Sequence, residues 1–445
     1  MSVSEESRAN SNLSVVSKDD NFPTDNGVVV RHPDSQEHVE NVNVQNNGDD
    51  EDINETYYNF QLFLKQVQDN RAEPVVKYTR SFLRNFATQR AVWTASEQEK
   101  LLKDFKTFIY SKYKEYEPFK ELNKTELRNA KEGMEKLLMG KLYPYTFSPL
   151  LRKRLFSAGI EIDTEHKEDL IHDKKFKKMT MKYRFIEPHH LDINFQDPVK
   201  VKRFAKFASI ELNKMNNFKA PRDKMVCILN SCKIIFGFMK HFRDNGADSF
   251  VPLLVYSLIT GSIDHLVSNI QYIDRFRYTS LFRGEEKYYL SSLQAAFNFI
   301  LEMNDEKLTV TDSEEFKKLY QENLDSLKKE QQTQEKEKED QKQEPTNMID
   351  EMSNMVFNKF NELFIQDEKS TISSTPSSPS KHAKKNTEDD VSALIQDIQA
   401  KEHRETVETL TSMFPDLDVE IIEDVCIAKK HRIGPSVDIL LSLSN

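Results

Sequence analysis

The sequence predicts an all-α protein, and three observations support this fold class. Glycine is scarce, with 10 residues in 445, whereas average usage is about 7%. Lysine, glutamate, leucine and phenylalanine are abundant. Apolar residues recur at three- and four-residue steps, as on one face of an amphipathic helix. We expect a helical bundle, a second helical domain, a disordered linker and a small three-helix domain.

The shortage of glycine also excludes several classes of enzyme. Loops that cradle nucleotide phosphates need glycine, because a backbone without Cβ can approach the phosphate closely. The sequence contains no G-x-G-x-x-G, no G-x-x-x-x-G-K-[ST], no G-x-S-x-G and no H-E-x-x-H. A dehydrogenase, a P-loop NTPase, an α/β-hydrolase and a zincin are therefore not expected.

The cysteines predict no metal site. Cys227, Cys232 and Cys426 are too few for a disulfide framework, and the spacing of the first two fits no zinc pattern. His189 and His190 have no second ligand pair nearby. We interpret the cysteines as buried thiols in a reducing compartment. The polar, acidic amino terminus resembles neither a secretory signal nor a transit peptide, so a cytoplasmic protein is expected.

The net charge of −10 arises in residues 1–55. This segment holds 13 acidic and 3 basic residues, so residues 56–445 carry 60 of each sign. It has one aromatic residue, Phe22, and cannot bury enough apolar surface to offset chain entropy. We predict a disordered acidic tail followed by a charge-balanced body.

Residues 56–157 are predicted to form the helical bundle. Phe60, Phe63 and Val67 follow the helical period, and Thr94 with Glu97 has the spacing of a capping box. Residues 158–304 are richer in apolar residues and are predicted to form a second helical domain. Six bases lie between Lys174 and Arg184; a solvated helix face is favoured there over contact with acidic lipid or a partner. Nucleic-acid binding is not expected, because no basic stripe continues beyond this run.

Residues 305–400 are predicted to be a linker. Residues 326–346 have one large apolar residue and are interpreted as a solvated linker or a single exposed helix. Residues 347–364 are predicted to form an amphipathic helix with a methionine-rich face. We hypothesise that this helix covers a functional groove of the preceding domain and is displaced when the last domain binds its partner.

Residues 401–445 are predicted to form a compact module of three short helices. Met413-Phe414-Pro415 ends the first helix, and Leu440-Leu441 lies in the third. Because so small a core is marginal, exposed apolar residues are costly, and these two patches are candidates for a binding surface.

Through these two patches, residues 401–445 resemble the CUE domain, whose pattern is Met-Phe-Pro followed by a closing di-leucine. CUE domains bind monoubiquitin, so the resemblance implies that ubiquitin contacts Met413, Phe414, Pro415, Leu440 and Leu441. It also leaves open a homodimer through this domain. A domain that packs these residues internally is the alternative.

Residues 158–302 resemble the VPS-nine domain, the catalytic module of exchange factors for early-endosomal Rab GTPases. Five stretches carry the resemblance: Glu187 to Ile193, Ala220 to Lys224, Gly246 to Pro252, Ser268 to Ile273 and Gly284 to Tyr289. The order of several motifs is more specific than any one of them.

The resemblance implies the residues that contact the GTPase. The catalytic aspartate corresponds to Asp248, and the tyrosine that contacts the switch region corresponds to Tyr288. Ser291 stands where relatives often have threonine. Pro252 shapes the groove, and Val251, Val255 and Tyr256 either line it or belong to the core. From spacing alone, a cap of the following apolar helix is the favoured role for Asp248, and the resemblance reverses that preference.

The predicted function is therefore guanine-nucleotide exchange on an early-endosomal Rab, coupled to monoubiquitin binding in endocytic and vacuolar transport. Cofactors are not expected, because Mg²⁺ and GDP or GTP belong to the GTPase. The protein is expected to be cytoplasmic and recruited peripherally to endosomes, with direct membrane contact left open. The alternatives are an inactive adaptor that binds the Rab and ubiquitin, and a lipid-binding scaffold.

Overall fold

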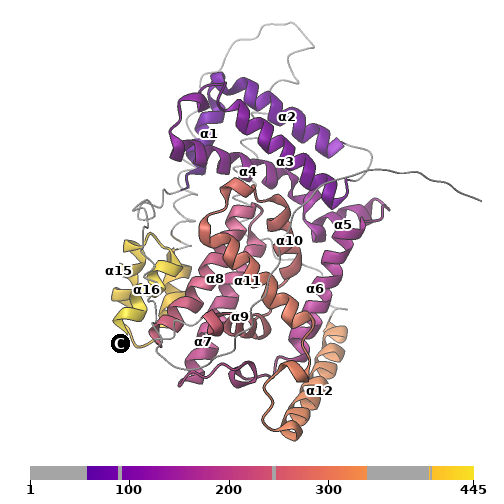
Figure 1. The fold of residues 1–445 in the computed structure, drawn as a ribbon, viewed down its shortest axis with the longest axis vertical. Coiled ribbons are helices and arrows are strands. Elements are labelled where there is room, and N and C mark those ends of the chain that lie inside the picture. Colours follow the sequence, from indigo (N-terminus) through magenta and orange to yellow (C-terminus); the bar gives the residue numbers. More distant parts are fainter. Residues whose placement is uncertain (1–57, 89–92, 243–246, 338–399, 401–402, 445) are drawn as a thin grey trace, which may run out of the picture. The chain divides into compact units, whose positions relative to one another are not determined.

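The computed structural model describes residues 58–88, 93–242, 247–337, 400 and 403–444, with the backbone alone given for 247 and 331–337. Every regular element within these ranges is helical (Figure 1), which confirms the predicted all-α class. None of the helices described is long and apolar enough to cross a lipid bilayer. The predicted acidic tail and the 347–364 helix lie outside the described residues.

The first helices form a bundle in the region predicted for one. Its long helix α4 packs against α1, α2, α3 and α5. The capping box predicted at Thr94 is present, because its hydroxyl accepts from the Glu97 amide and the Glu97 carboxylate accepts from the Thr94 amide. The helices are α1 (Phe60–Gln68), α2 (Glu73–Thr88), α3 (Ala95–Lys112), α4 (Lys124–Thr146) and α5 (Ser148–Ser157).

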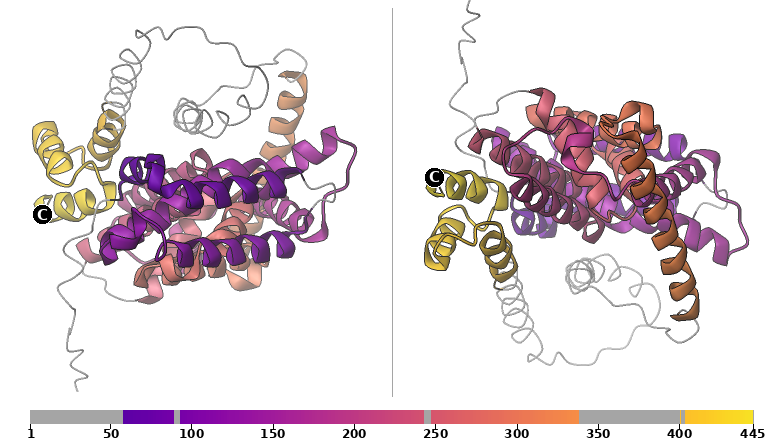
Figure 2. Two further views of the ribbon diagram at one scale, coloured as in Figure 1. Left: turned by 90° about the horizontal axis from the view of Figure 1, so that it is seen from above. Right: turned by 90° about the horizontal axis from the view of Figure 1, so that it is seen from below.

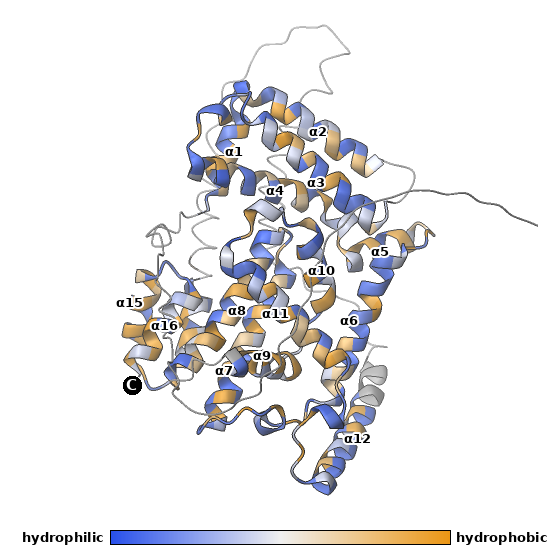
Figure 3. Ribbon diagram, in the orientation of Figure 1, coloured by the Kyte–Doolittle hydropathy of each residue, from blue (hydrophilic) through white to orange (hydrophobic). Residues whose placement is uncertain are grey.

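The next helices surround α8, which packs against α7, α9, α10 and α11. Helix α9 is apolar along nearly its whole length (Figure 3), and from Leu253 to Ile259 every side chain is buried. The helices are α6 (Thr164–Lys182), α7 (Pro198–Asn213), α8 (Pro221–His241), α9 (Ala247–Thr260), α10 (Leu266–Phe276) and α11 (Gly284–Leu301).

A buried ionic network joins the bundle to the end of α10. The Arg277 guanidinium donates to Glu132 at 2.5 Å and to Glu135 at 2.9 Å, and its side chain is 1% exposed. The Lys106 ammonium donates to Glu135 at 2.9 Å and to the carbonyl of Phe276. Burial alone would raise the pKa of Glu135, but the charges of Lys106 and Arg277 outweigh it and lower that pKa. The carboxylates from α4 thus anchor α10.

The packed region extends beyond residue 304, where we expected the linker to begin. Helix α12 (Ser313–Glu337) lies beside α6 and projects from the other helices in both views of Figure 2. Its Phe316 is buried, and the Asn323 amide donates to the carbonyls of Met181 and Lys182. Of the stretch 326–346, for which we weighed a solvated linker or a single exposed helix, residues 326–337 are helical and the rest lie outside the described residues. The first half of α12 is held by the preceding domain.

The basic run of α6 is partly paired within the molecule. Arg184 bonds the Glu330 carboxylate at 2.7 Å, and Lys177 bonds Asp264 at 3.1 Å. These pairs favour the solvated helix face over a dedicated lipid-binding patch.

The last module contains helical residues 403–413, α15 (Val419–Ala428) and α16 (Ile433–Leu443). Asp418 caps α15 by accepting from the Glu420 amide. Helix α16 packs on α8, and Gly237 of α8 lies in this contact. A Cβ there would lie 2.9 Å from Leu441 and 3.3 Å from Val437, so the missing side chain permits this close packing.

Candidate functional site

The beginnings of α9 and α11 lie together over a cluster of aromatic rings. Phe250 is fully buried and stacks on Phe236 of α8, with ring centroids 4.3 Å apart. On its other side Phe250 stacks with Tyr288 at 6.2 Å, and Tyr289 lies 6.3 Å away. Three helices therefore fix the surface where the predicted catalytic residues emerge.

Asp248 lies in the first turn of α9 and is exposed. Within the described residues its carboxylate has no hydrogen-bond or ion-pair partner. The helix begins at Ala247, so Asp248 is part of the helix and not the residue that caps it. The positive end of the helix dipole favours a carboxylate at this position. An exposed, unpaired carboxylate is available to a cation of another molecule.

Pro252 is inside α9, four residues after Asp248. Proline has no amide hydrogen, so the carbonyl of Asp248, four residues earlier, receives no intrahelical bond from it. Pro252 and Val251 are half-buried and follow Asp248 on one face of the helix. The proline thus leaves a polar backbone group beside the carboxylate.

On α11, Tyr288 and Ser291 share an exposed face, because residues three apart are neighbours on a helix. The Tyr288 side chain is 48% exposed even though one face of its ring stacks on Phe250. Its hydroxyl and outer face are therefore open to a partner. The structure brings Asp248, Pro252, Tyr288 and Ser291 to one pair of helices.

The two remaining groove candidates are in the core. Val255 and Tyr256 are each 2% exposed, and burial raises the pKa of the Tyr256 hydroxyl. The sequence left open whether these residues line a groove or fill the core. Their burial means that they support α9 from within.

Four of the five residues predicted to bind ubiquitin are also buried. Met413, Phe414, Leu440 and Leu441 are 6% exposed or less, whereas Pro415 is exposed. Phe414 packs edge-on against Phe204 of α7, with ring centroids 6.0 Å apart. The alternative of internal packing therefore describes this arrangement, in which one hydrophobic core includes α7, α8 and the last module.

One histidine and one aspartate of the first matched stretch, His190 and Asp192, have structural roles. The His190 imidazole accepts from the Glu187 amide at 2.8 Å, and the His190 carbonyl accepts from the Thr309 amide at 2.9 Å. The Asp192 carboxylate accepts from the Thr309 hydroxyl at 2.6 Å. This turn ties the segment after α11 to the domain.

Phe236 and Phe250 were missed as supporting residues. Phe250 belongs to the matched stretch that contains Asp248, which was the available signal. Phe236 comes from another helix, and its ring contact with Phe250 is not encoded in sequence spacing.

Comparison with known protein families identifies two of these regions. Residues 205–305 match the Vacuolar sorting protein 9 (VPS9) domain, and residues 403–444 match the CUE domain. The chain carries a VPS9 domain and a C-terminal CUE domain. Residues 77–143 match a domain of unknown function, DUF5601, within the bundle. The VPS9 match begins inside α7, later than the boundary at residue 158 that we expected.

Three curated relatives illustrate the similarity. The vacuolar protein sorting-associated protein vps901 of Schizosaccharomyces pombe is 40% identical over 63% of this chain and 48% of its own length. Vacuolar protein sorting-associated protein 9A of Arabidopsis thaliana is 30% identical over 59% of this chain and 47% of its own length. The human Rab5 GDP/GTP exchange factor is 27% identical over 56% of this chain and 48% of its own length. The chain therefore spans about half the length of these relatives.

Proposed function

We propose that this protein is a guanine-nucleotide exchange factor for Rab GTPases of the Rab5 class. One relative that shares the VPS9 region is named as such a factor. The observation that carries the proposal is the exposed pair of Asp248 on α9 and Tyr288 on α11, two helices that meet at the buried ring of Phe250.

The proposed mechanism is competition for the groups that hold the nucleotide. A GTPase binds its nucleotide through Mg²⁺ and a P-loop lysine on the β-phosphate. The Asp248 carboxylate accepts a hydrogen bond from that lysine and repels the phosphate from the metal site. The exchange factor thereby lowers nucleotide affinity, and by linkage free nucleotide lowers the affinity of the GTPase for the factor. Mg²⁺ and nucleotide are supplied by the GTPase.

Tyr288 and Ser291 have a different role in this proposal. Their exposed face on α11 docks on the switch region, with the tyrosine ring as the apolar contact and the two hydroxyls as hydrogen-bonding groups. Aromatic residues that are exposed yet rigidly supported are typical anchors of protein interfaces.

The test is release of a fluorescent GDP analogue from a purified Rab5-class GTPase. A hydrogen bond to a charged group contributes about 1.5–3 kcal/mol, so Asp248→Ala should lower the exchange rate about 10–100-fold. Asp248→Asn, which keeps the shape of the side chain, should lose nearly as much. Unchanged rates in both variants would contradict the exchange mechanism, and retained GTPase binding would then favour the inactive adaptor.

We propose further that the CUE domain binds monoubiquitin and that this contact competes with its packing on α8. Met413, Phe414, Leu440 and Leu441 are buried, so ubiquitin reaches them only when α16 separates from α8. The same condition applies to a homodimer through these residues. Ubiquitin on endosomal cargo would then have two effects: it would recruit the protein to endosomes and separate the CUE domain from α8.

A further inference from the structure

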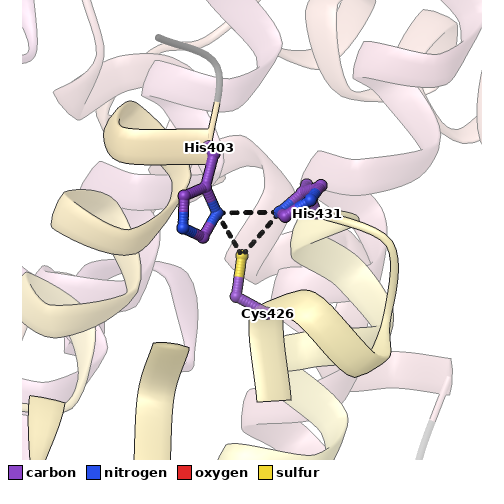
Figure 4. A group of neighbouring side chains, drawn as sticks. All are labelled: His403, Cys426 and His431. Carbon is purple, nitrogen blue, oxygen red and sulfur yellow. Dashed lines mark hydrogen bonds between the residues drawn. The ribbon is translucent and has the colours of Figure 1, made fainter. Parts of the chain in front are cut away.

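Three side chains of the CUE domain meet at a point that the site above does not use (Figure 4). The Nδ1 atoms of His403 and His431 are 2.8 Å apart. The Cys426 sulfur lies 3.6 Å from the His431 Nδ1 and 3.9 Å from the His403 Nδ1. The cysteine is fully buried, His403 is half-buried and His431 is exposed.

These residues come from three separate parts of the domain. His403 is in the helical segment 403–413, Cys426 is in the last turn of α15, and His431 is in the connection to α16. Lys430 and His431 both adopt left-handed backbone conformations, with φ of 53° and 58°. This turn lets the His431 amide donate to the Cys426 carbonyl at 2.8 Å. It brings the imidazole back over the sulfur.

The separations match those of ligands around one tetrahedral ion. Zinc binds imidazole nitrogen at about 2.0–2.1 Å and thiolate sulfur at about 2.3 Å. Tetrahedral angles then place two nitrogens about 3.3 Å apart and a nitrogen and a sulfur about 3.6 Å apart. The two nitrogen–sulfur distances, 3.6 and 3.9 Å, fit directly, and the nitrogen pair needs to open by about half an ångström.

A carboxylate stands behind one of the histidines. The Glu423 Oε1 lies 3.4 Å from the His403 Nε2, on the ring edge opposite the cluster. If Nε2 carries the proton and donates to Glu423, Nδ1 presents its lone pair to the cluster. A carboxylate in this position fixes the tautomer of metal-binding histidines and strengthens the nitrogen ligand.

We propose that His403, Cys426 and His431 form a zinc site, with Glu423 positioning His403 and a water as fourth ligand on the open side. Two imidazoles and a thiolate are ligands that suit Zn²⁺ better than Mg²⁺ or Ca²⁺. On binding, the thiol proton passes to solvent and the metal takes its place on sulfur. The exposed position of His431 gives the ion a route of entry.

The proposed ion has a structural consequence. It connects the helical segment 403–413, the end of α15 and the turn before α16. A domain of this size has a marginal core and gains stability from such a link. The site is distinct from Met413, Phe414 and the di-leucine, so its loss need not remove the ubiquitin contact itself.

The alternative is that His403, Cys426 and His431 hold no metal and contact one another directly. In it, the His431 Nδ1–H donates to the His403 Nδ1, and the thiol packs against both rings. The two descriptions differ in whether sulfur loses its proton to a bound metal. That difference is directly visible by spectroscopy.

The test uses the full chain, purified without a polyhistidine tag and stripped of metal. Zinc affinity is measured by competition with a chromophoric chelator, and Co²⁺ is titrated as a spectroscopic probe. We expect one Zn²⁺ per chain and a thiolate-to-cobalt charge-transfer band with tetrahedral d–d bands. Glu423→Gln should weaken zinc binding about 10–100-fold, and the zinc should protect the domain from thermal unfolding.

The variants distinguish zinc bound by these three residues from zinc bound nonspecifically by other side chains on the surface. His431→Ala changes an exposed side chain, so loss of zinc in this variant does not depend on a folding defect. Cys426→Ser should abolish the charge-transfer band, whereas Cys227→Ser, at a buried cysteine of α8, should keep it. The proposal is overturned if the wild-type chain binds Zn²⁺ no more tightly than the His403→Ala/His431→Ala double variant. It is also overturned if Co²⁺ gives no thiolate band.

Discussion

The ring of Tyr288 stacks on Phe250, with centroids 6.2 Å apart and planes inclined by 25°. Phe250 is two residues after Asp248 in the same helix. This buried ring therefore packs the beginning of α9, which carries Asp248, against Tyr288 of α11. Docking of the GTPase and displacement of its nucleotide are therefore carried by neighbouring helices. Substitutions at the two residues should nevertheless change different kinetic constants.

Tyr288→Ala should raise the KM for the GTPase by about 30-fold, because truncating an interface anchor costs about 2 kcal/mol. Its kcat should change little, since the tyrosine docks the partner and does not reach the nucleotide. Tyr288→Phe keeps the stacked ring and should lose about fivefold at most, the value of one neutral hydrogen bond. Initial rates over a range of GTPase concentrations give both constants.

Asp248→Ala should show the opposite division, with kcat lowered and KM nearly unchanged. If both variants alter the same constant, the separate roles proposed for the two residues are wrong.

Gly237→Leu should increase the affinity for ubiquitin. The nearest atoms to a Cβ at this position all belong to α16, so the added side chain acts on the CUE contact. Overpacking costs about 1–3 kcal/mol, and a larger undocked population raises the apparent affinity by about fivefold or more. Titration calorimetry with monoubiquitin measures it.

Gly237→Ala provides the graded control, because a single methyl group displaces only the flexible end of Leu441. An affinity that is equal in the wild type and the leucine variant would mean that α8 does not compete with ubiquitin.

Lys224 should make the free energy of unfolding depend on pH. Its ammonium is fully buried and donates to the Met215 carbonyl at 2.9 Å and to the Asn269 side chain at 2.6 Å. Burial lowers its pKa from 10.5 to about 7. At pH values between these two pKa values, the unfolded chain binds more protons than the folded chain. The contribution of Lys224 to the free energy of unfolding therefore rises with pH, by at most about 1.4 kcal/mol per pH unit.

Chemical denaturation between about pH 7 and pH 10 measures this slope. Lys224→Met should flatten it, while Lys177→Met, at a side chain 60% exposed, should leave the slope unchanged. A slope that is identical in wild type and Lys224→Met would contradict the lowered pKa.

Arg277→Ala should destabilise the protein by about 3–5 kcal/mol, because it leaves buried carboxylates without their partner. The matched control is Lys177→Ala, which breaks an exposed ion pair and should cost less than about 1 kcal/mol. Urea denaturation followed by circular dichroism compares the two. Equal losses in the two variants would show that the Arg277 network carries no special stability.

Much of the fold was predictable because it follows local patterns. The helical period of Phe60, Phe63 and Val67 and the capping box at Thr94 are set by neighbouring residues, and the structure confirms both. The end of the packed region was not predictable. Phe316 lies in a mostly polar stretch, and only its burial and the contacts of Asn323 with distant residues show that α12 is held.

The site was predicted less completely, for the same reason. Asp248 and Tyr288 were found through motif order, but the ring that supports them was not. Leu441 packs against the glycine of another helix, Gly237, which lies far from it in the sequence. His403, Cys426 and His431 follow no familiar ligand spacing, because a left-handed turn brings them together.

The Arg277 network also bears on how the molecule unfolds. Arg277 comes from the VPS9 domain, whereas Lys106, Glu132 and Glu135 come from the preceding bundle. Separating the two parts would therefore leave buried charges without their partners. The bundle and the VPS9 domain should therefore melt in a single cooperative transition. A fragment limited to the matched residues 205–305 would lack Glu132 and Glu135, and the boundary of the folding unit is accordingly wider than the boundary of the sequence family.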